Sequence, residues 1–500
     1  MKRRAVCSYG VGLLMIACQG VSGCAHVSAR GGSGQRAALT WYTKGLMLER
    51  TSRLSDAMDA YRHALEHDRQ SPAVAVRIGA THVKLGQPEQ GLKSFQRALS
   101  LDPDDRDALR WLAMLQTSQG RIVDAIDAYE RLLKSEPDDR AALSALADLY
   151  VLQGRLVQAT ELYERLIDEE GSSYQLHFNL GVLYGRLGML SASLEQLSRS
   201  FELDPDSVEV RAALGLTYEL NQEPEKALAH YRDAIRLDPS NVRLYLHAAR
   251  VLAGQDRTQE AVDVYEQALE TVPGNEEAVV GLVRVLMVGR RYGDAQRVLS
   301  RALQASGKPA NLYLLLGLVY REANEPLEAL RAFERAVASN PTAAHPHFYL
   351  GHQLEQLDRH EEARAELRQT IALDPNHADA LNYLGYMDAE RGVNLREAKE
   401  LIERAVDVDP ENGAYVDSLG WVYYQLGDMD KAITHLERAS QLLDTDPTIF
   451  DHLGDAYYKQ GDYGKAASAW QKALELDRSL QAIQHKLETL QAGHVAVPSY

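Results

Sequence analysis

The feature that most constrains this chain is a sequence repeat of 34 residues. Short segments ending in proline recur at that interval or a multiple of it, at Pro103, Pro137, Pro205, Pro239, Pro273, Pro341 and Pro375. One extra residue near Asn394 moves the next such proline to position 410. A unit of this length cannot bury its apolar face alone, so neighbouring units must stack. The period therefore predicts an array of like units rather than one compact core.

Inside a unit, the apolar residues are spaced as in two helices separated by a turn. In the unit that begins at 413, one helical face is formed by Leu419, Val422, Tyr423 and Leu426. Gly427 and Asp428 then break the pattern, and a second helix is lined by Ala432, Leu436 and Ala439. Each unit is thus predicted to be a pair of antiparallel helices.

This pattern resembles the tetratricopeptide repeat, which places Gly or Ala eighth and Ala twentieth in each unit. The eighth position matches at Gly45, Gly79, Gly181, Gly215, Gly317, Gly351, Gly385, Gly420 and Gly454. The twentieth matches at Ala57, Ala125, Ala159, Ala227, Ala261, Ala295, Ala329, Ala363, Ala398, Ala432 and Ala466. Small residues allow paired helices to approach closely. The departures are Val283 at the eighth position, and Gly91 and Ser193 at the twentieth.

The resemblance implies an all-α, right-handed superhelical solenoid of about thirteen helix-turn-helix units over residues 38–480. A capping helix is expected at 481–492 and a tail at 493–500. The units are predicted at 38–71, 72–105, 106–139, 140–173, 174–207, 208–241, 242–275, 276–309, 310–343, 344–377, 378–412, 413–446 and 447–480. No stretch is left for a separate catalytic domain, so an enzyme is not expected.

The first residues carry a different signal. Lys2, Arg3 and Arg4 precede an apolar stretch, residues 5–17, that is too short to span a membrane. The following sequence, VSGC at residues 21–24, resembles the lipobox of bacterial lipoproteins. The resemblance implies a signal peptide at 1–23, a lipid on Cys24 and a flexible tether at 24–37. Cys18 is a poorer second match, and an uncleaved anchor or a plain signal peptide are the alternatives.

Ala25 follows the lipidated position, where Asp retains lipoproteins in the inner membrane of well-studied diderm bacteria. The resemblance therefore implies an outer-membrane protein that faces the periplasm. The formal net charge of −17 argues against nucleic-acid binding, because phosphates would be repelled. All three cysteines lie within the first 24 residues, which excludes a disulfide framework or a cysteine-based zinc site elsewhere. No metal or other cofactor is expected.

In the tetratricopeptide family, the first helix of each pair lines a concave groove through its second, fifth, ninth and twelfth positions. Positions of this kind in units 7 to 9 carry a basic stripe, Arg250, Arg284 and Arg321. Those of units 10 to 13 are Phe348, His352, Asn382, Tyr386, Asp417, Trp421, Tyr424, Asp451, Asp455 and Tyr458. Aromatic rings with amide and carboxylate groups suit an extended peptide. The alternatives are that Trp421 and Tyr424 pack on neighbouring helices, and that Asp417 and Asp451 are ordinary solvated charges.

Some motifs resemble metal-binding, catalytic or phosphate-binding sites. His63, Glu66 and His67 have the H-x-x-E-H spacing of some zinc peptidases, but they fall on the second helix of the first unit. His345, His347 and His352 cluster without a supporting carboxylate. Asp417 and Asp451 are equivalent positions of adjacent units, yet an open groove suits acid–base catalysis poorly. The GK dipeptide at 464–465 lacks P-loop spacing and is expected to be a turn.

The hypothesis favoured by the sequence is a lipid-anchored envelope scaffold or adaptor. It would bind protein or peptide partners, such as a periplasmic protease or a cell-wall hydrolase, in the groove. The alternative is a lipoprotein that binds peptidoglycan or another polysaccharide, or that assists export. A zinc metallopeptidase centred on His63, Glu66 and His67 is the third hypothesis.

Overall fold

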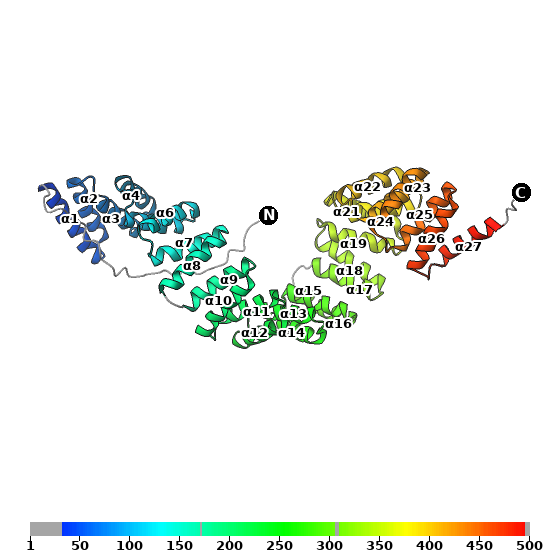
Figure 1. The fold of residues 1–500 in the computed structure, drawn as a ribbon, viewed down its shortest axis with the longest axis horizontal. Helices are drawn as coiled ribbons and strands as arrows, with labels where there is room; N and C mark the ends of the chain where they lie inside the picture. The colour runs from blue at the N-terminus through cyan, green and yellow to red at the C-terminus, as the bar shows by residue number, and fades with distance from the viewer. Residues whose placement is uncertain (1–32, 171–172, 306–309, 496–500) are drawn as a thin grey trace. The chain divides into compact units, whose positions relative to one another are not determined.

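The computed structural model describes residues 33–170, 173–305 and 310–495. The chain divides into two compact units, Met1–Lys226 and Ala227–Tyr500, here called the N-terminal and C-terminal units. Over the described ranges every regular element is a helix and none is a strand (Figure 1). No helix in those ranges combines the length and the apolar character that crossing a membrane requires. The predicted all-α array of helix pairs is confirmed.

The helices are evenly sized and are separated by short turns. The first twelve, of which α12 crosses the boundary between the units, are α1 (Ser33–Arg50), α2 (Leu54–His67), α3 (Pro72–Lys84), α4 (Pro88–Leu101), α5 (Arg106–Ser118), α6 (Ile122–Ser135), α7 (Arg140–Gln153), α8 (Leu156–Glu170), α9 (Tyr174–Arg186), α10 (Leu190–Leu203), α11 (Val208–Leu220) and α12 (Pro224–Leu237).

The C-terminal unit continues the same alternation. Its helices are α13 (Val242–Gly254), α14 (Thr258–Thr271), α15 (Glu276–Val288), α16 (Tyr292–Ala305), α17 (Ala310–Glu322), α18 (Pro326–Ser339), α19 (Ala344–Glu355), α20 (His360–Leu373), α21 (Ala378–Glu390), α22 (Leu395–Val408), α23 (Gly413–Leu426), α24 (Met429–Leu442), α25 (Pro447–Gln460), α26 (Tyr463–Leu476) and α27 (Gln481–Val495). Most odd-numbered helices pack more extensively on the helix that follows than on the one before, as in α19 with α20 and α23 with α24.

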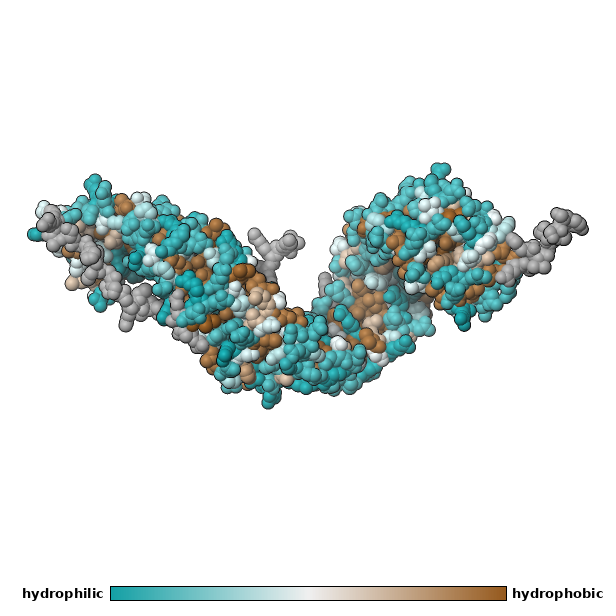
Figure 2. Space-filling model, in the orientation of Figure 1, coloured by the Kyte–Doolittle hydropathy of each residue, from teal (hydrophilic) through white to brown (hydrophobic). Residues whose placement is uncertain are grey.

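The core is built around one large residue in each pair. Four of the largest fully buried side chains, Tyr61, Phe95, Tyr231 and Phe333, all occupy position 24 of their repeat. On the face shown in Figure 2, mostly hydrophilic residues cover the surface between smaller apolar patches. The apolar area is therefore buried mainly between and within helix pairs, as a stacked array requires.

The glycine at the eighth position makes room for this large residue. A Cβ on Gly317 would lie 2.3 Å from Cε1 of Phe333, and one on Gly454 would lie 2.4 Å from Cδ1 of Trp470. Ser193, one of the departures from the pattern, is buried, and its hydroxyl donates to the Gly181 carbonyl oxygen at 2.8 Å. The two helices of this pair therefore still approach closely where serine replaces the usual alanine.

Two recurrent hydrogen bonds join one repeat to the next. The arginine at position 26 donates to the carbonyl of the proline that closes the preceding repeat, as from Arg131 to Pro103 at 2.6 Å and from Arg438 to Pro410 at 2.8 Å. A tyrosine at position 11 donates to a glutamate on the preceding even-numbered helix, as in Tyr150 to Glu130 at 2.8 Å. These bonds fix the stacking of successive pairs, in addition to apolar contact.

The array closes with α27, which takes the place of the first helix of a further repeat. Its Ile483 is buried and its Leu487 and Leu490 are partly buried against the last helix pair. Lys486 reaches back to Asp451 on α25 at 2.7 Å. The helix thus covers the last apolar face, as a capping helix must.

Candidate functional site on the odd-helix face

The site residues predicted for the last four repeats lie on successive odd-numbered helices of the C-terminal unit. Neighbouring odd-numbered helices touch directly, α21 with α23 and α23 with α25. Helix α19 meets α21 through the rings of Phe348 and His352, which both lie against Tyr383. Their fifth, ninth and twelfth positions therefore form one continuous surface, here called the odd-helix face. It carries Phe348, His352, Asn382, Tyr386, Asp417, Trp421, Tyr424, Asp451, Asp455 and Tyr458.

An aromatic stack occupies one part of the odd-helix face. The half-buried Trp421 ring lies 4.7 Å from the ring of Tyr424 on the same helix, with 7° between their planes. It also stacks on His452 of α25 at 4.1 Å. The ammonium of Lys459 lies 4.2 Å from the Tyr424 ring, a cation–π contact. Trp421 therefore packs on a neighbouring helix, as the alternative interpretation expected, and still leaves part of its surface open.

Polar atoms on this face lack hydrogen-bond partners. The indole Nε1 of Trp421 is buried and unpaired among the described residues, and so are Nδ1 of His352 and Oδ1 of Asn382. Buried polar groups in proteins are nearly always paired, and each unpaired one costs about 1–3 kcal/mol. Three such groups lie on three successive odd-numbered helices, α19, α21 and α23.

A second aromatic group surrounds His352. Its ring lies 4.8 Å from that of Tyr383, and the Phe348 ring lies 4.9 Å from His377. Burial lowers the pKa of His352, and Arg321 lowers it further. His352 is therefore a neutral group at pH 7, able to donate or accept one hydrogen bond.

The carboxylates of the face are engaged within the protein. Asp417 is only 6% exposed, and both its oxygens lie 3.0 Å from Nδ1 of His452. Burial opposes protonation of His452, but Asp417, with Asp451 and Asp455 nearby, raises the pKa of this imidazole overall. Asp417 is thus neither a solvated charge nor an open ligand of the groove.

Asp451 and Asp455 share one partner. The ammonium of Lys486 on α27 lies 2.7 Å from an oxygen of each carboxylate. The indole of Trp470 also donates to Asp455 at 3.2 Å. Burial raises the pKa of Asp455, against the effect of Lys486. Asp417 and Asp451 are therefore held by different cations and do not form a pair of catalytic acids, while Tyr458 remains largely exposed beside them.

The predicted basic stripe is spread over α13, α15 and α17. Arg250 is exposed and its guanidinium contacts Nδ1 of His247 at 2.7 Å. Arg250 and Arg284 both act on the Tyr265 hydroxyl, whose pKa is raised by burial and lowered by the two arginines. Arg321 instead lies over the Tyr349 ring at 5.8 Å. The first two arginines thus both lie near Tyr265, and the third belongs to the aromatic group around His352.

The motifs that resemble metal sites have local contacts instead. His63 contacts Glu66 at 3.1 Å and its ring lies 4.7 Å from that of Trp41. His347 is buried between Glu366, at 2.5 Å, and the Pro341 carbonyl, at 3.0 Å. Across the described ranges, no group of three or more His, Cys, Asp or Glu side chains is arranged to hold a metal ion.

Two remaining predictions concern the ends of the chain and the GK dipeptide. Gly461 ends α25 with a φ of 92°, and the carboxylate of Asp462 accepts from the Lys465 amide at 3.1 Å. This segment is the turn between α25 and α26. The predicted lipid attachment at Cys24 and residues 24–32 of the predicted tether lie outside the described residues, and residues 33–37 of that tether instead belong to α1.

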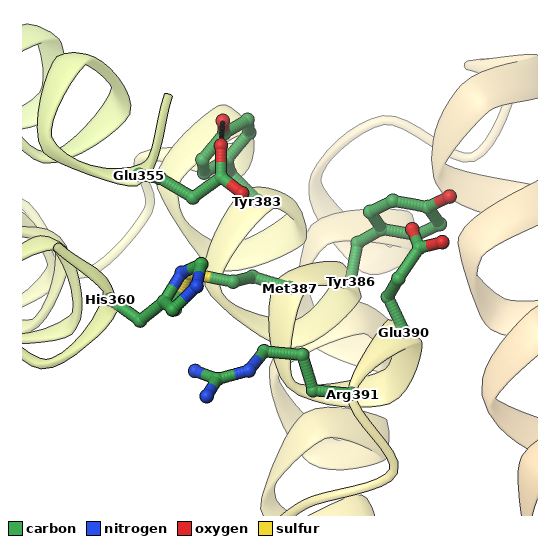
Figure 3. Close-up of a pocket in the computed structure, with 7 residues that line it drawn as sticks. All are labelled: Glu355, His360, Tyr383, Tyr386, Met387, Glu390 and Arg391. Atoms are coloured by element: carbon green, nitrogen blue, oxygen red, sulfur yellow. Dashed lines mark hydrogen bonds between the residues drawn. The ribbon is translucent and has the colours of Figure 1, made fainter. Parts of the chain in front are cut away.

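A pocket beside the odd-helix face was not anticipated from the sequence. It has a volume of about 270 Å³ and is lined by Glu355, His360, Tyr383, Tyr386, Met387, Glu390 and Arg391 (Figure 3). The Tyr383 hydroxyl donates to Glu355 at 3.0 Å. Only Tyr386 had been singled out, because the pocket forms where helices end rather than along their faces. Glu355, at the twelfth position of its unit, was the available signal.

Comparison with protein families supports the repeat assignment. Models described as tetratricopeptide repeat match residues 84–149, 142–172, 178–242, 213–276, 252–319, 310–342, 348–392 and 447–480, and one described as TPR repeat matches 420–461. Together they extend over most of both units. No curated protein matches the chain in sequence.

Several solved structures are similar. The APC/C hetero-tetramer Cut9–Hcn1 aligns at 14% identity over 92% of this chain and 96% of the other, with a TM-score of 0.42. Yeast Tom70 aligns at 18% identity over 91% and 99%, with a TM-score of 0.39. YrrB, titled a TPR protein with an unusual peptide-binding site, aligns at 26% identity over 37% and 95%, with a TM-score of 0.30.

Proposed function

We propose that this chain, a protein of tetratricopeptide repeats, is a scaffold that binds an extended segment of a partner protein along its odd-helix face. The observation that carries the proposal is the set of unpaired buried polar atoms on Trp421, Asn382 and His352. An extended backbone offers both N–H and C=O groups at regular intervals. Pairing them with these side chains would remove costs of about 1–3 kcal/mol each.

The aromatic stack supplies the apolar part of the same interaction. Trp and Tyr provide large contact areas at a small entropic cost, and they dominate binding at many interfaces. The stack of Trp421 on Tyr424 is held from beneath by His452, so it is already ordered before a partner arrives. Preorganisation of this kind improves affinity, because less freedom is lost on binding.

The proposed location is the envelope. A lipid on Cys24, followed by the tether, would hold the repeats at the outer membrane on its periplasmic side. Partners bound to the scaffold would then have a higher local concentration at the membrane without needing any additional binding contacts. A periplasmic protease or a cell-wall hydrolase is the partner class that we favour.

A second candidate function is binding of a glycan, either peptidoglycan or another polysaccharide, or assembly of an export apparatus. The exposed ring of Tyr458, next to the stack of Trp421 and Tyr424, favours it, because sugar rings stack on open aromatic faces. The zinc peptidase hypothesis has no such observation in its favour, since His63 and Glu66 contact each other at an exposed helix end.

The binding proposal is tested by Trp421→Ala. We expect this variant to capture much less partner from envelope extracts than the wild type, while its far-UV circular dichroism stays unchanged. Trp111→Ala, in the N-terminal unit, is the matched control, and its capture should be normal. Equal capture by Trp421→Ala and the wild type would contradict the proposal, and retention on purified peptidoglycan that Trp421→Ala alone abolishes would favour the glycan alternative.

The anchoring proposal is tested by Cys24→Ser. We expect this variant to lose labelling by palmitate and to leave the membrane fraction. Cys18→Ser is the matched control and should remain labelled and membrane-bound. Labelling that persists in Cys24→Ser and disappears in Cys18→Ser would contradict the assignment of Cys24.

A further inference from the structure

The pocket beside the odd-helix face is formed where three helices begin or end. Glu355 is the last residue of α19 and Glu390 is the last of α21, while His360 is the first of α20. The carboxyl end of a helix carries a partial negative charge, which favours a cation nearby. Two carboxyl-terminal ends therefore add to the negative charge of their own glutamates at this pocket, and the single amino-terminal end, that of α20, opposes them in part.

Among the described residues neither glutamate forms an ion pair, although the cation of Arg391 also lines the pocket. No Lys, Arg or His of the described chain lies within 4.0 Å of the carboxylate of Glu355 or Glu390. Their contacts are tyrosine hydroxyls, from Tyr383 to Glu355 and from Tyr386 to Glu390. Burial raises the pKa of both tyrosines, and the adjacent carboxylate raises it further. The phenols thus stay neutral, and each ring lies beside its own glutamate (Figure 3).

The remaining lining completes a receptor for one side chain. Figure 3 shows Met387 extending toward His360, which adds an apolar side chain to the lining. Nδ1 of His360 is buried and has no partner among the described residues. A volume of about 270 Å³ falls just below the range of about 300–1,000 Å³ typical of small-molecule sites. The pocket therefore fits a single long side chain better than a cofactor.

We propose that this pocket receives the cationic end of a lysine or arginine side chain on the partner segment bound along the odd-helix face. Tyr386 belongs to both surfaces, so a segment that contacts Tyr386 on the face lies beside the pocket. The methylenes of the side chain would contact Met387 and the tyrosine rings, and its charge would face the two glutamates. This inference rests on the proposed function for its partner, and it can be tested without one.

The test uses the purified protein and n-butylammonium chloride, a mimic of the lysine side chain, with n-propylguanidinium as the mimic of arginine. Methyl NMR of methionine-labelled protein reports on Met387, whose signal is assigned with Met387→Leu. Ionic strength is held constant with sodium chloride. We expect a saturable shift of the Met387 methyl with at least one of the two cations and no such shift with n-butanol at equal concentration.

Variants that remove a negative charge and one that removes a positive charge should change the affinity for these cations in opposite directions. Glu355→Gln and Glu390→Gln should each weaken binding about twofold to fivefold, the effect of one exposed ion pair. Arg391→Gln, which removes the positive charge of the pocket lining, should strengthen it by a similar factor. Glu361→Gln, an exposed position on α20, is the control of equal charge and should leave binding unchanged.

Two results would overturn the inference. One is a Met387 shift with n-butanol equal to that with both cations, and the other is unchanged binding in Glu355→Gln and Glu390→Gln. Because the assay contains no partner, these results leave the proposed function untouched. Conversely, if partner capture is independent of Trp421 while the cations still bind, the proposed function is wrong and the inference that the pocket binds a cation is retained.

Discussion

Replacing Asp417 by Asn would remove one charge from the buried pair beneath the aromatic stack. Asp417 and His452 are each only 6% exposed, and they contact each other through both carboxylate oxygens. Breaking a buried ion pair by removing one partner costs about 3–5 kcal/mol. Asn keeps the shape and one oxygen acceptor, which returns about 1 kcal/mol. We therefore expect Asp417→Asn to destabilise this region by about 2–4 kcal/mol when His452 is charged.

The effect should depend on pH in one direction. The pKa of His452 is raised above its ordinary value of 6.5 in the folded protein. A raised histidine pKa contributes stability that is fully present below the unfolded value and is lost as the pH rises through the folded value. The difference between the wild type and Asp417→Asn should thus be largest at pH 6 and should shrink toward pH 9.

Hydrogen exchange is the suitable assay, because repeat arrays open locally rather than in one step. Peptides covering α23 and α25 should lose protection in Asp417→Asn, after correction for the intrinsic pH dependence of exchange. Peptides from α5 should not change. Asp407→Asn, at an exposed position, is the matched control. A loss of protection that is equal at pH 6 and pH 9, or that grows with pH, would refute the reasoning.

Two further predictions concern packing between paired helices. In Gly317→Ala the new Cβ would lie 2.3 Å from Phe333, so thermal denaturation should show a cost of about 1–3 kcal/mol; Gly293→Ala, where nothing lies within 4 Å, should be neutral or stabilising. Ala432→Arg places a long cation at a fully buried position and should destabilise α23 and α24 by about 3 kcal/mol or more. A wild-type melting temperature for either Gly317→Ala or Ala432→Arg would contradict the packing described here.

The fold could be predicted from the sequence because its determinants are local and repeated. Glycine at the eighth position and a large residue at the twenty-fourth belong to the same helix pair, so the residues of each pair determine how its two helices pack. The capping helix was predictable for a related reason: residues 481–492 continue the helical pattern without a second helix to pair with.

The polar contacts between repeats were not predicted, because periodicity says which helices touch but not which polar atoms meet. Asp417 and Asp451 were interpreted as groove carboxylates, yet each is held by a cation 35 residues later, His452 and Lys486. That constant separation is one repeat plus one residue, and it is a usable signal. The pocket beside Tyr386 depends on where α19 and α21 end and where α20 begins, which the repeat alone does not determine.

The measurement that tests the central claim most directly is photocrosslinking in cells, with a photoreactive residue at position 424 on the odd-helix face. Position 472, exposed on α26, is the matched control. The account predicts that mass spectrometry finds one defined partner segment joined to position 424 and not to position 472. Equal crosslinking from both positions, or none from 424 while 472 captures a defined partner, would contradict it.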